Sequence, residues 1–201
     1  HRGITEELYL QTRIFAGRID EAAALNPAIL DLIYAERSQD EAGTERSNYR
    51  AMNGWHSRVT LHREPAYADL VAAIDQQLAV VSEASGYDPK HRLEITTMWA
   101  ITNGPGGFNK AHIHPKSLWS GVYYVQTPKG CGDIEFTDPR TMLLMEPPAY
   151  VPNTTKKRSR WTTVTFTPEP GKLVVFPAWL YHGVAPNLTE STGDAADRAL
   201  T

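Results

Sequence analysis

Two histidines stand one residue apart in the stretch Asn109-Lys-Ala-His112-Ile-His114-Pro115, which is closely followed by Ser120-Gly-Val-Tyr-Tyr-Val125. Successive side chains of a strand point to opposite faces, so in an extended segment His112 and His114 point the same way and Ile113 points the other way. Two imidazoles on one face can hold a metal ion. The stretch therefore predicts a metal-binding segment within a β region.

A third histidine can complete this site. His182 follows His114 by 68 residues and comes directly after the strand-like run Lys172-Leu-Val-Val-Phe-Pro-Ala-Trp-Leu180, so a neighbouring strand could bring it beside the pair. Imidazole suits iron, zinc, nickel and copper. A lone His-x-His can also arise by chance on a surface strand, in which case its role is structural. We expect surface or packing roles for the remaining histidines, which are His1, His56, His62 and His91.

Around these histidines, from about residue 90 onward, short runs rich in Thr, Val, Tyr and Trp alternate with Gly and Pro clusters, a pattern typical of an antiparallel β region. Seven or more strands of this kind favour a sandwich or jelly roll. The expected strands are 93–101, 111–114, 120–126, 133–137, 162–167, 173–176 and a last one from Arg198 onward.

Helices are expected before residue 90. Residues 22–35 carry apolar side chains near helical spacing, with Asn26-Pro27 as a plausible cap and first-turn pair. A longer apolar stripe covers 65–84, and Gly86 is suited to end that helix. We therefore predict one domain over 1–201, in which a helical support region (1–90) covers the outer face of a β core (91–201).

Composition narrows the class of protein. The 201 residues contain 20 Lys and Arg against 23 Asp and Glu, for a net charge of −3, so no positive excess draws the whole chain to nucleic acid. Cys131 is the only cysteine, which excludes an intrachain disulfide framework and a thiolate zinc site and favours the cytoplasm. No apolar run reaches the ~18 to 20 residues that a membrane span needs, and we expect no membrane partner.

Three further polar side chains, those of Ser120, Tyr124 and Arg198, raise the question of an anionic ligand. Ser120, Val122 and Tyr124 share one face of their strand, and if that face is interior, the polar tips need partners. A bound anion is one such partner, and a backbone carbonyl is another. Arg198 shares a strand face with Leu200, and its guanidinium suits a carboxylate, although a surface edge position is equally consistent with the sequence.

These runs resemble the iron(II)- and 2-oxoglutarate-dependent oxygenases, specifically a small group with the pattern N-x2-H-x-H-P-x-S-x2-S-G-V-Y-Y-V. The same group continues with G-x-I-x-F-x-D-P-R, found here at 132–140, and F-P-x2-L-x-H-x-V-x-P, found here at 176–186. The resemblance covers about 93–201, and Gly54-Trp-His-Ser57 matches a further feature of the group.

The resemblance implies a mainly β fold with flanking helices, a cupin-like double-stranded β-helix (jelly roll) around a metal pocket. His112, His114 and His182 would hold Fe(II), with no catalytic residue beyond these ligands. His114 falls where the wider superfamily usually has aspartate or glutamate, so the site would be one charge more positive, and the native metal is left open between iron and zinc, nickel or copper.

The resemblance also implies 2-oxoglutarate as cosubstrate. Tyr124 and Arg198 match residues that contact its distal carboxylate, and Ser120 and Asn109 belong to the same expected cofactor-binding set. A longer loop over 187–197 would explain the unusual distance between His182 and Arg198. O2 and a small-molecule or peptide substrate are the expected partners, with oxidative decarboxylation to succinate and CO2 coupled to hydroxylation of a C–H bond.

Two other functions fit the same residues. A cupin-type metal dioxygenase that does not use 2-oxoglutarate is favoured by Gly106 before His112-x-His114, although the glutamate usual in cupins is missing from 117–120. The second alternative is a non-catalytic jelly roll that binds a metal or a ligand. The basic run 156–160 is expected to be a solvated loop or a pocket lid. The sequence indicates neither the prime substrate nor the oligomeric state.

Overall fold

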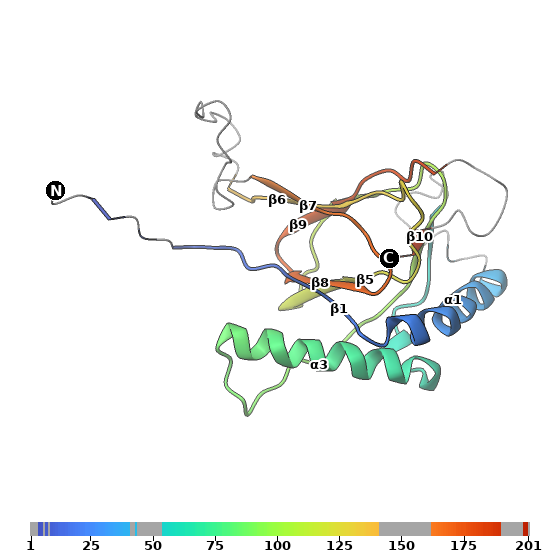
Figure 1. The fold of residues 1–201 in the computed structure, drawn as a ribbon, viewed down its shortest axis with the longest axis horizontal. Helices are drawn as coiled ribbons and strands as arrows, with labels where there is room; N and C mark the ends of the chain where they lie inside the picture. Colours follow the sequence, from blue (N-terminus) through green and yellow to red (C-terminus); the bar gives the residue numbers. More distant parts are fainter. Residues whose placement is uncertain are drawn as a thin grey trace.

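Two antiparallel sheets face each other in this computed structural model, and two helices lie outside one of them (Figure 1). The structure describes residues 4–5, 7, 9–40, 43, 54–140, 162–189 and 199–200. Arg198 and the basic run 156–160 lie outside the described residues, as does most of the segment between the first helix and residue 54.

The helix-backed sheet has the order β1-β8-β5. Its strands are β1 (Phe15–Arg18), β8 (Lys172–Pro177) and β5 (Trp119–Tyr123). In the register of β5 and β8, Gly121 lies opposite Val175 and Val122 lies opposite Val174. Side chains of these two strands therefore alternate between the helices on one side and the facing sheet on the other.

The second large sheet carries the histidines and has the order β4-β9-β6-β7. Its strands are β4 (Asn109–His112), β9 (Tyr181–Val184), β6 (Ile134–Thr137) and β7 (Thr163–Phe166). His112 of β4 is the register partner of His182 in β9, and Phe136 of β6 lies opposite His182 on the other side. A smaller sheet joins β10 (Ala199–Leu200), β3 (Ile101–Asn103) and β2 (Gly54–His56).

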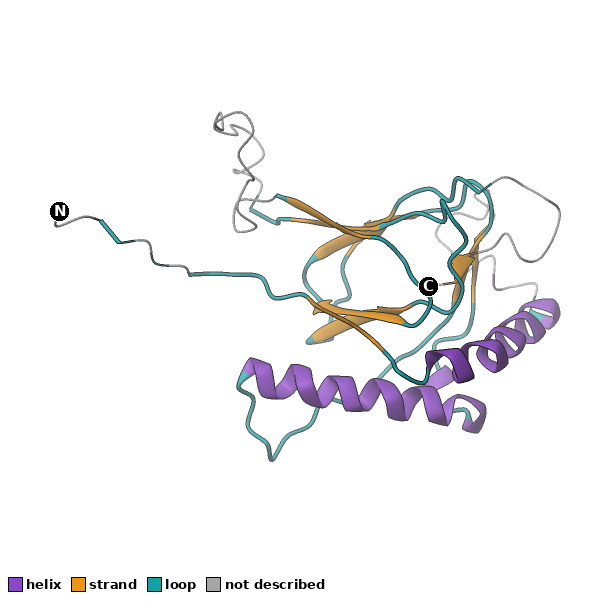
Figure 2. Ribbon diagram, in the orientation of Figure 1, coloured by secondary structure: helices purple, strands orange, loops and turns teal. Residues whose placement is uncertain are grey.

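Helices α1 (Ala22–Gln39) and α3 (Ala68–Ser85) pack on the outer side of β1-β8-β5 (Figure 2). Two short 3-10 turns, Leu61–Arg63 and Pro65–Tyr67, lead into α3. Gly86 ends α3 with a φ of 73°, a left-handed conformation that glycine adopts without strain, as the sequence predicts.

Two clusters of buried side chains result from this layering. The outer core lies between the helices and the first sheet, and the inner core lies between the two sheets. The buried members of the outer core are Ile19, Ala22, Ile29, Ile33, Trp55, Leu61, Tyr67, Leu70, Ala73, Val81, Ala100, Tyr123, Leu173 and Val175. Those of the inner core are Tyr124, Ile134, Phe136, Val174, Phe176 and Leu180. The predicted mainly β jelly roll with flanking helices is confirmed.

Two predictions about local structure are wrong. The segment 93–101 is not a continuous strand: β3 begins only at Ile101, because the preceding residues bond to the loop after β2, where Met98 N donates to Val59 O. The Asn26-Pro27 pair does not cap α1, since the helix begins at Ala22. Asn26 instead accepts a hydrogen bond from Tyr123 and donates one to the carbonyl of Val125, which docks α1 on the end of β5.

Three strands were not predicted as such. They are β1, β2 and β9, each of three or four residues. The 111–114 strand is also displaced, because β4 ends at His112 and leaves His114 just beyond it.

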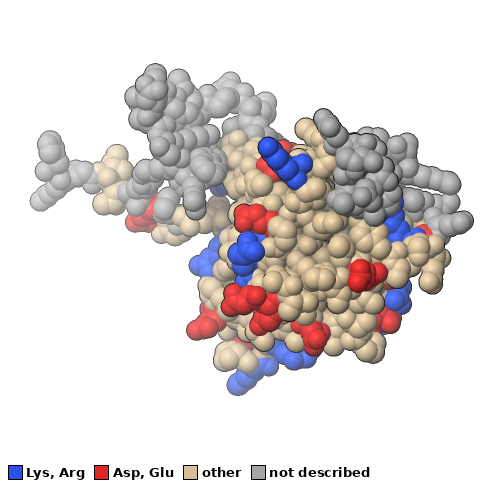
Figure 3. Space-filling view, turned by 45° about the vertical axis from the view of Figure 1, so that its right-hand side comes forward, with Lys and Arg blue, Asp and Glu red and all other residues tan. Residues whose placement is uncertain are grey.

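Charge is mixed on the surface that Figure 3 presents, where Lys and Arg side chains are interspersed with Asp and Glu. No helix in the described ranges combines the length and the apolar character needed to cross a bilayer.

Candidate metal centre

The three predicted histidines converge on one side of the inner core. His112 ends β4, His114 lies two residues further on, and His182 is the second residue of β9. Strands β4 and β9 can approach closely because residue 183 is glycine: a Cβ there would lie 2.8 Å from the carbonyl oxygen of Asn109. The neighbouring register pair His112 and His182 is thereby brought together.

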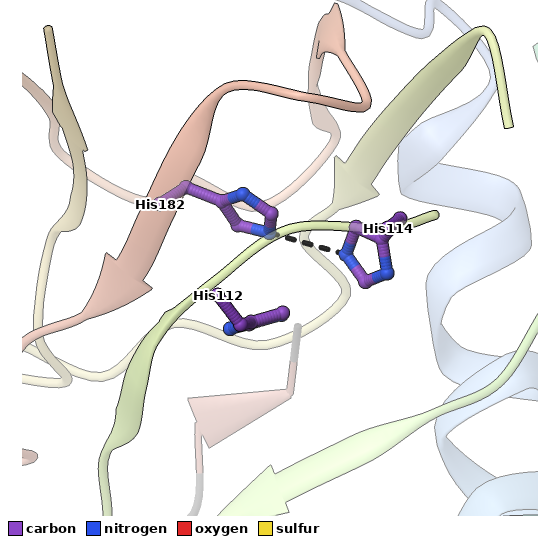
Figure 4. A group of neighbouring side chains, drawn as sticks. All are labelled: His112, His114 and His182. Carbon is purple, nitrogen blue, oxygen red and sulfur yellow. Dashed lines mark hydrogen bonds between the residues drawn. The ribbon is translucent and has the colours of Figure 1, made fainter. Parts of the chain in front are cut away.

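The three rings face one another (Figure 4). Their centroids lie 4.3 Å apart for His112 and His182, 4.9 Å for His112 and His114, and 5.0 Å for His114 and His182. One ligand nitrogen from each ring lies within 4.8 Å of the other two. No other such group of His, Cys, Asp or Glu occurs among the described residues.

Backbone carbonyls orient two of the rings. Nδ1 of His112 donates to the carbonyl of Lys110 at 2.7 Å, and Nδ1 of His182 donates to that of Leu180 at 2.9 Å. A proton on Nδ1 leaves the lone pair of each neutral ring on Nε2. This is the arrangement that partner groups impose on metal-binding histidines.

His114 completes the group through its own Nε2, which lies 3.1 Å from Nε2 of His182. Because His182 has its proton on Nδ1, this network assigns the shared proton to His114. A metal ion would take the place of that proton, since two nitrogens 3.1 Å apart can each lie about 2.1 Å from one ion.

Burial favours the neutral form of His114 and His182, which is the form of imidazole that binds metals. It lowers the pKa of His182 to about 4, and His112 and His114 lower it further while the bond to Leu180 opposes the shift. Burial also lowers the pKa of His114, with a smaller contribution from His112. Three imidazole ligands suit Fe(II), zinc, nickel or copper, and they leave coordination positions open, whereas a closed structural site has four protein ligands.

A cavity of about 420 Å³ lies beside the three imidazoles and reaches past β5 toward the helices. Asn109 and Ser120, both predicted cofactor-binding residues, contribute to its wall. Apart from the histidines, the ionisable side chains of the wall are Glu94, Lys116 and two tyrosines. Asn109 is itself fixed, because its Oδ1 accepts a hydrogen bond from Nδ2 of Asn103 at 2.9 Å.

Tyr124 directly follows β5 and lies in the inner core together with Val122, with which the alternation predicts a shared face. Its hydroxyl is buried and has no hydrogen-bond partner in the described part of the chain. Burial, with Cys131 and Asp133 adding to it, raises the pKa of Tyr124 well above its ordinary value, so the hydroxyl stays protonated and can donate.

The cavity does not reach Tyr124 directly, because that residue is not among the described residues of the wall. Val122, Ile134 and Phe176 belong both to the wall and to the inner core around Tyr124. Tyr124 therefore packs in the same cluster as residues of the cavity wall. An orphaned buried donor of this kind fits a bound carboxylate.

Sequence reasoning missed two residues of this centre. Trp99 has its ring centroid 5.5 Å from that of His114, and His56 stacks on Trp99 at 5.5 Å with an interplanar angle of 13°. The motif at 54–57 was the only signal that pointed toward His56, for which a surface or packing role was expected.

Residues 97–193 match a family described as "Putative 2OG-Fe(II) oxygenase". No curated protein matches the chain.

Solved structures of low identity share the fold. A prolyl-4-hydroxylase from Pseudomonas putida has a TM-score of 0.58 at 16% identity, over 94% of this chain and 89% of its own. A Trichoplax adhaerens prolyl hydroxylase, in complex with a hypoxia inducible factor peptide, has a TM-score of 0.57 at 15% identity, over 93% and 80%. HygX from Streptomyces hygroscopicus, with nickel and 2-oxoglutarate bound, has a TM-score of 0.57 at 13% identity, over 94% of this chain and 80% of its own.

Proposed function

We propose that this chain, whose residues 97–193 match the 2OG-Fe(II) oxygenase family, hydroxylates a C–H bond of its substrate with iron held by His112, His114 and His182. The observation that carries the proposal is the convergence of three imidazoles beside a cavity. Iron bound there supplies activation of O2, coupled to decarboxylation of 2-oxoglutarate.

Binding of 2-oxoglutarate is the first task of the protein side chains. We assign its distal carboxylate to the Tyr124 hydroxyl, the buried donor without a partner. Ser120 and Asn109 lie in the wall that the cosubstrate would contact on its way to the iron. Arg198 is proposed as the cationic partner of the same carboxylate, as the sequence motif implies.

The overall reaction balances without further reagents. One atom of O2 enters the hydroxyl group of the product, the other enters succinate, and CO2 carries away the first carboxyl group of 2-oxoglutarate. The protein contributes orientation, because the carbonyls of Lys110 and Leu180 hold two of the imidazoles.

The prime substrate is proposed only as a class, either a small molecule or a peptide. A peptide is bound by one structural neighbour, the Trichoplax prolyl hydroxylase, and this is the support for the peptide class. A cytoplasmic location and the lack of a nucleic-acid partner stay predictions from the sequence.

The test is a measurement of O2 consumption and succinate release by protein loaded with Fe(II), with and without 2-oxoglutarate, across candidate substrates. We expect both signals to require 2-oxoglutarate and to be lost in His182→Ala. O2 consumption that proceeds equally without 2-oxoglutarate would identify a cupin-type dioxygenase instead. No consumption under any condition, with iron bound, would favour a binding module.

A further inference from the structure

The three histidines are not held in the same way. His112 and His182 each donate a ring N–H to a carbonyl two residues earlier. His114 has no such carbonyl: in the described ranges, the one hydrogen bond of its ring is to His182. The torsion that orients an imidazole is broad, so a ring without a hydrogen bond needs packing to fix its direction.

Packing is supplied by Trp99. Its ring lies at 50° to that of His114, with the centroids 5.5 Å apart, and it also forms part of the cavity wall. Among the described residues, the other ring in contact with the indole is His56, stacked at 13° and also 5.5 Å away. The three rings therefore form a row that runs from β2 to the metal centre.

The backbone beneath this row is firmly held. Ser57, which is fully buried, donates its N–H to the carbonyl of Ala100 at 2.9 Å. Its Oγ accepts the N–H of Ala100 at 2.8 Å. Ala100 directly follows Trp99, and Ser57 directly follows His56. These two hydrogen bonds, one between backbones and one to the Ser57 side chain, therefore hold the segments that carry the two stacked rings against each other.

We propose that Trp99, supported by His56, is a positioning residue that holds the third ligand of the metal centre, His114, in its binding orientation. The proposal rests on the proposed metal site. It makes His114 the ligand most sensitive to its neighbours, whereas His112 and His182 keep their orientation through the backbone.

Cobalt(II) tests this without turnover, because the ring N–H protons of histidines bound to Co(II) give separate, strongly shifted NMR signals. We expect three such signals in the unaltered protein, with that of His114 exchanging fastest with D2O because no carbonyl protects it. In Trp99→Leu, we expect the His114 signal to broaden or disappear, the other two to persist, and Co(II) affinity to fall about tenfold, the lower end for residues that orient metal ligands.

Three variants complete the experiment. Trp99→Phe keeps a ring beside His114 and should restore the third signal. His56→Leu should weaken Co(II) binding in the same direction but less, and it remains informative if Trp99→Leu does not fold. Trp179→Leu is the control, since this tryptophan is half exposed and has no ring contact with the three histidines among the described residues.

The outcomes separate the two claims. If the unaltered protein and His182→Ala bind Co(II) equally, the metal site itself is wrong. If the unaltered protein shows three signals that depend on His182, and both Trp99→Leu and His56→Leu keep all three with unchanged affinity, the site stands and the positioning role of Trp99 is overturned.

Discussion

Tyr123 and Tyr124 are neighbours in sequence, but their side chains lie on opposite faces of the same sheet. The Tyr123 hydroxyl faces the helices and donates to Oδ1 of Asn26 at 2.6 Å. The Tyr124 hydroxyl faces the other sheet, is buried and has no partner in the part of the chain described. The outer face of the sheet is satisfied by the protein itself, whereas the inner face keeps an unused donor, which is what a ligand site requires.

The same contrast extends to the two cores. The buried members of the outer core are mostly apolar, and we assign those that lie outside the cavity wall, such as Ile19, to stability. Phe176 and Phe136 of the inner core lie against His182, with ring centroids 4.5 and 6.1 Å away. Substitutions on the two sides should therefore separate stability from ligand binding.

The largest effect is expected on the inner side. His182→Ala removes one of three metal ligands, and we expect activity at background and loss of stoichiometric iron binding. Iron content and succinate release measure this. His91→Ala is the matched control, because the side chain of His91 is 84% exposed and does not belong to the group of three histidines. Full activity in His182→Ala would contradict the assignment.

On the outer side, Ile19→Ala should reduce the free energy of unfolding by about 2 to 5 kcal/mol, since Ile19 is 2% exposed and its truncation leaves a cavity. Urea unfolding measures the loss. The folded fraction should bind Fe(II) with unchanged affinity. A weakened metal site at full folding would mean that the two cores are not independent.

Tyr124→Phe should weaken 2-oxoglutarate binding about tenfold, the effect of a hydrogen bond to a charged group. Its stability should be unchanged or slightly higher, because the lost hydroxyl has no partner within the described structure. Calorimetric titration of the iron-loaded protein and urea unfolding together check this. An unchanged dissociation constant would remove Tyr124 from the cosubstrate site.

Tyr123→Phe should affect stability rather than ligand binding, and the effect should be smaller than that of Tyr124→Phe. The free energy of unfolding should fall by about 1 kcal/mol, because Asn26 loses its donor. Affinity for 2-oxoglutarate should not change. If this variant and Tyr124→Phe behave alike in both measurements, the distinction between the two faces fails.

That these tyrosines lie on opposite faces could be predicted from the sequence, because strand alternation depends only on neighbouring residues; which face is the inner one came from the structure. The convergence of His112, His114 and His182 was likewise predicted, from the His-x-His spacing and the motif around His182. Local pattern was sufficient where the strand was long and rich in β-forming residues, as in β5 and β8.

Features that depend on distant contacts could not be read in this way. Strand β1 contains only four residues, and its pairing with β8 joins segments more than 150 residues apart. Asn26-Pro27 has the residue types of a helix cap. In the structure, however, Asn26 lies inside α1 and accepts a hydrogen bond from the Tyr123 hydroxyl, a contact between distant residues. The stack of His56 on Trp99 likewise arises from the pairing of β2 with β3 and has no local signature.

An anaerobic titration of the purified protein with Fe(II) and then 2-oxoglutarate, followed by visible absorption, tests the metal centre most directly. A weak charge-transfer band should appear with one equivalent of each and should be missing in His182→Ala. Folded protein that binds iron at one equivalent and develops no band, or a His182→Ala variant with the same band, would contradict the account.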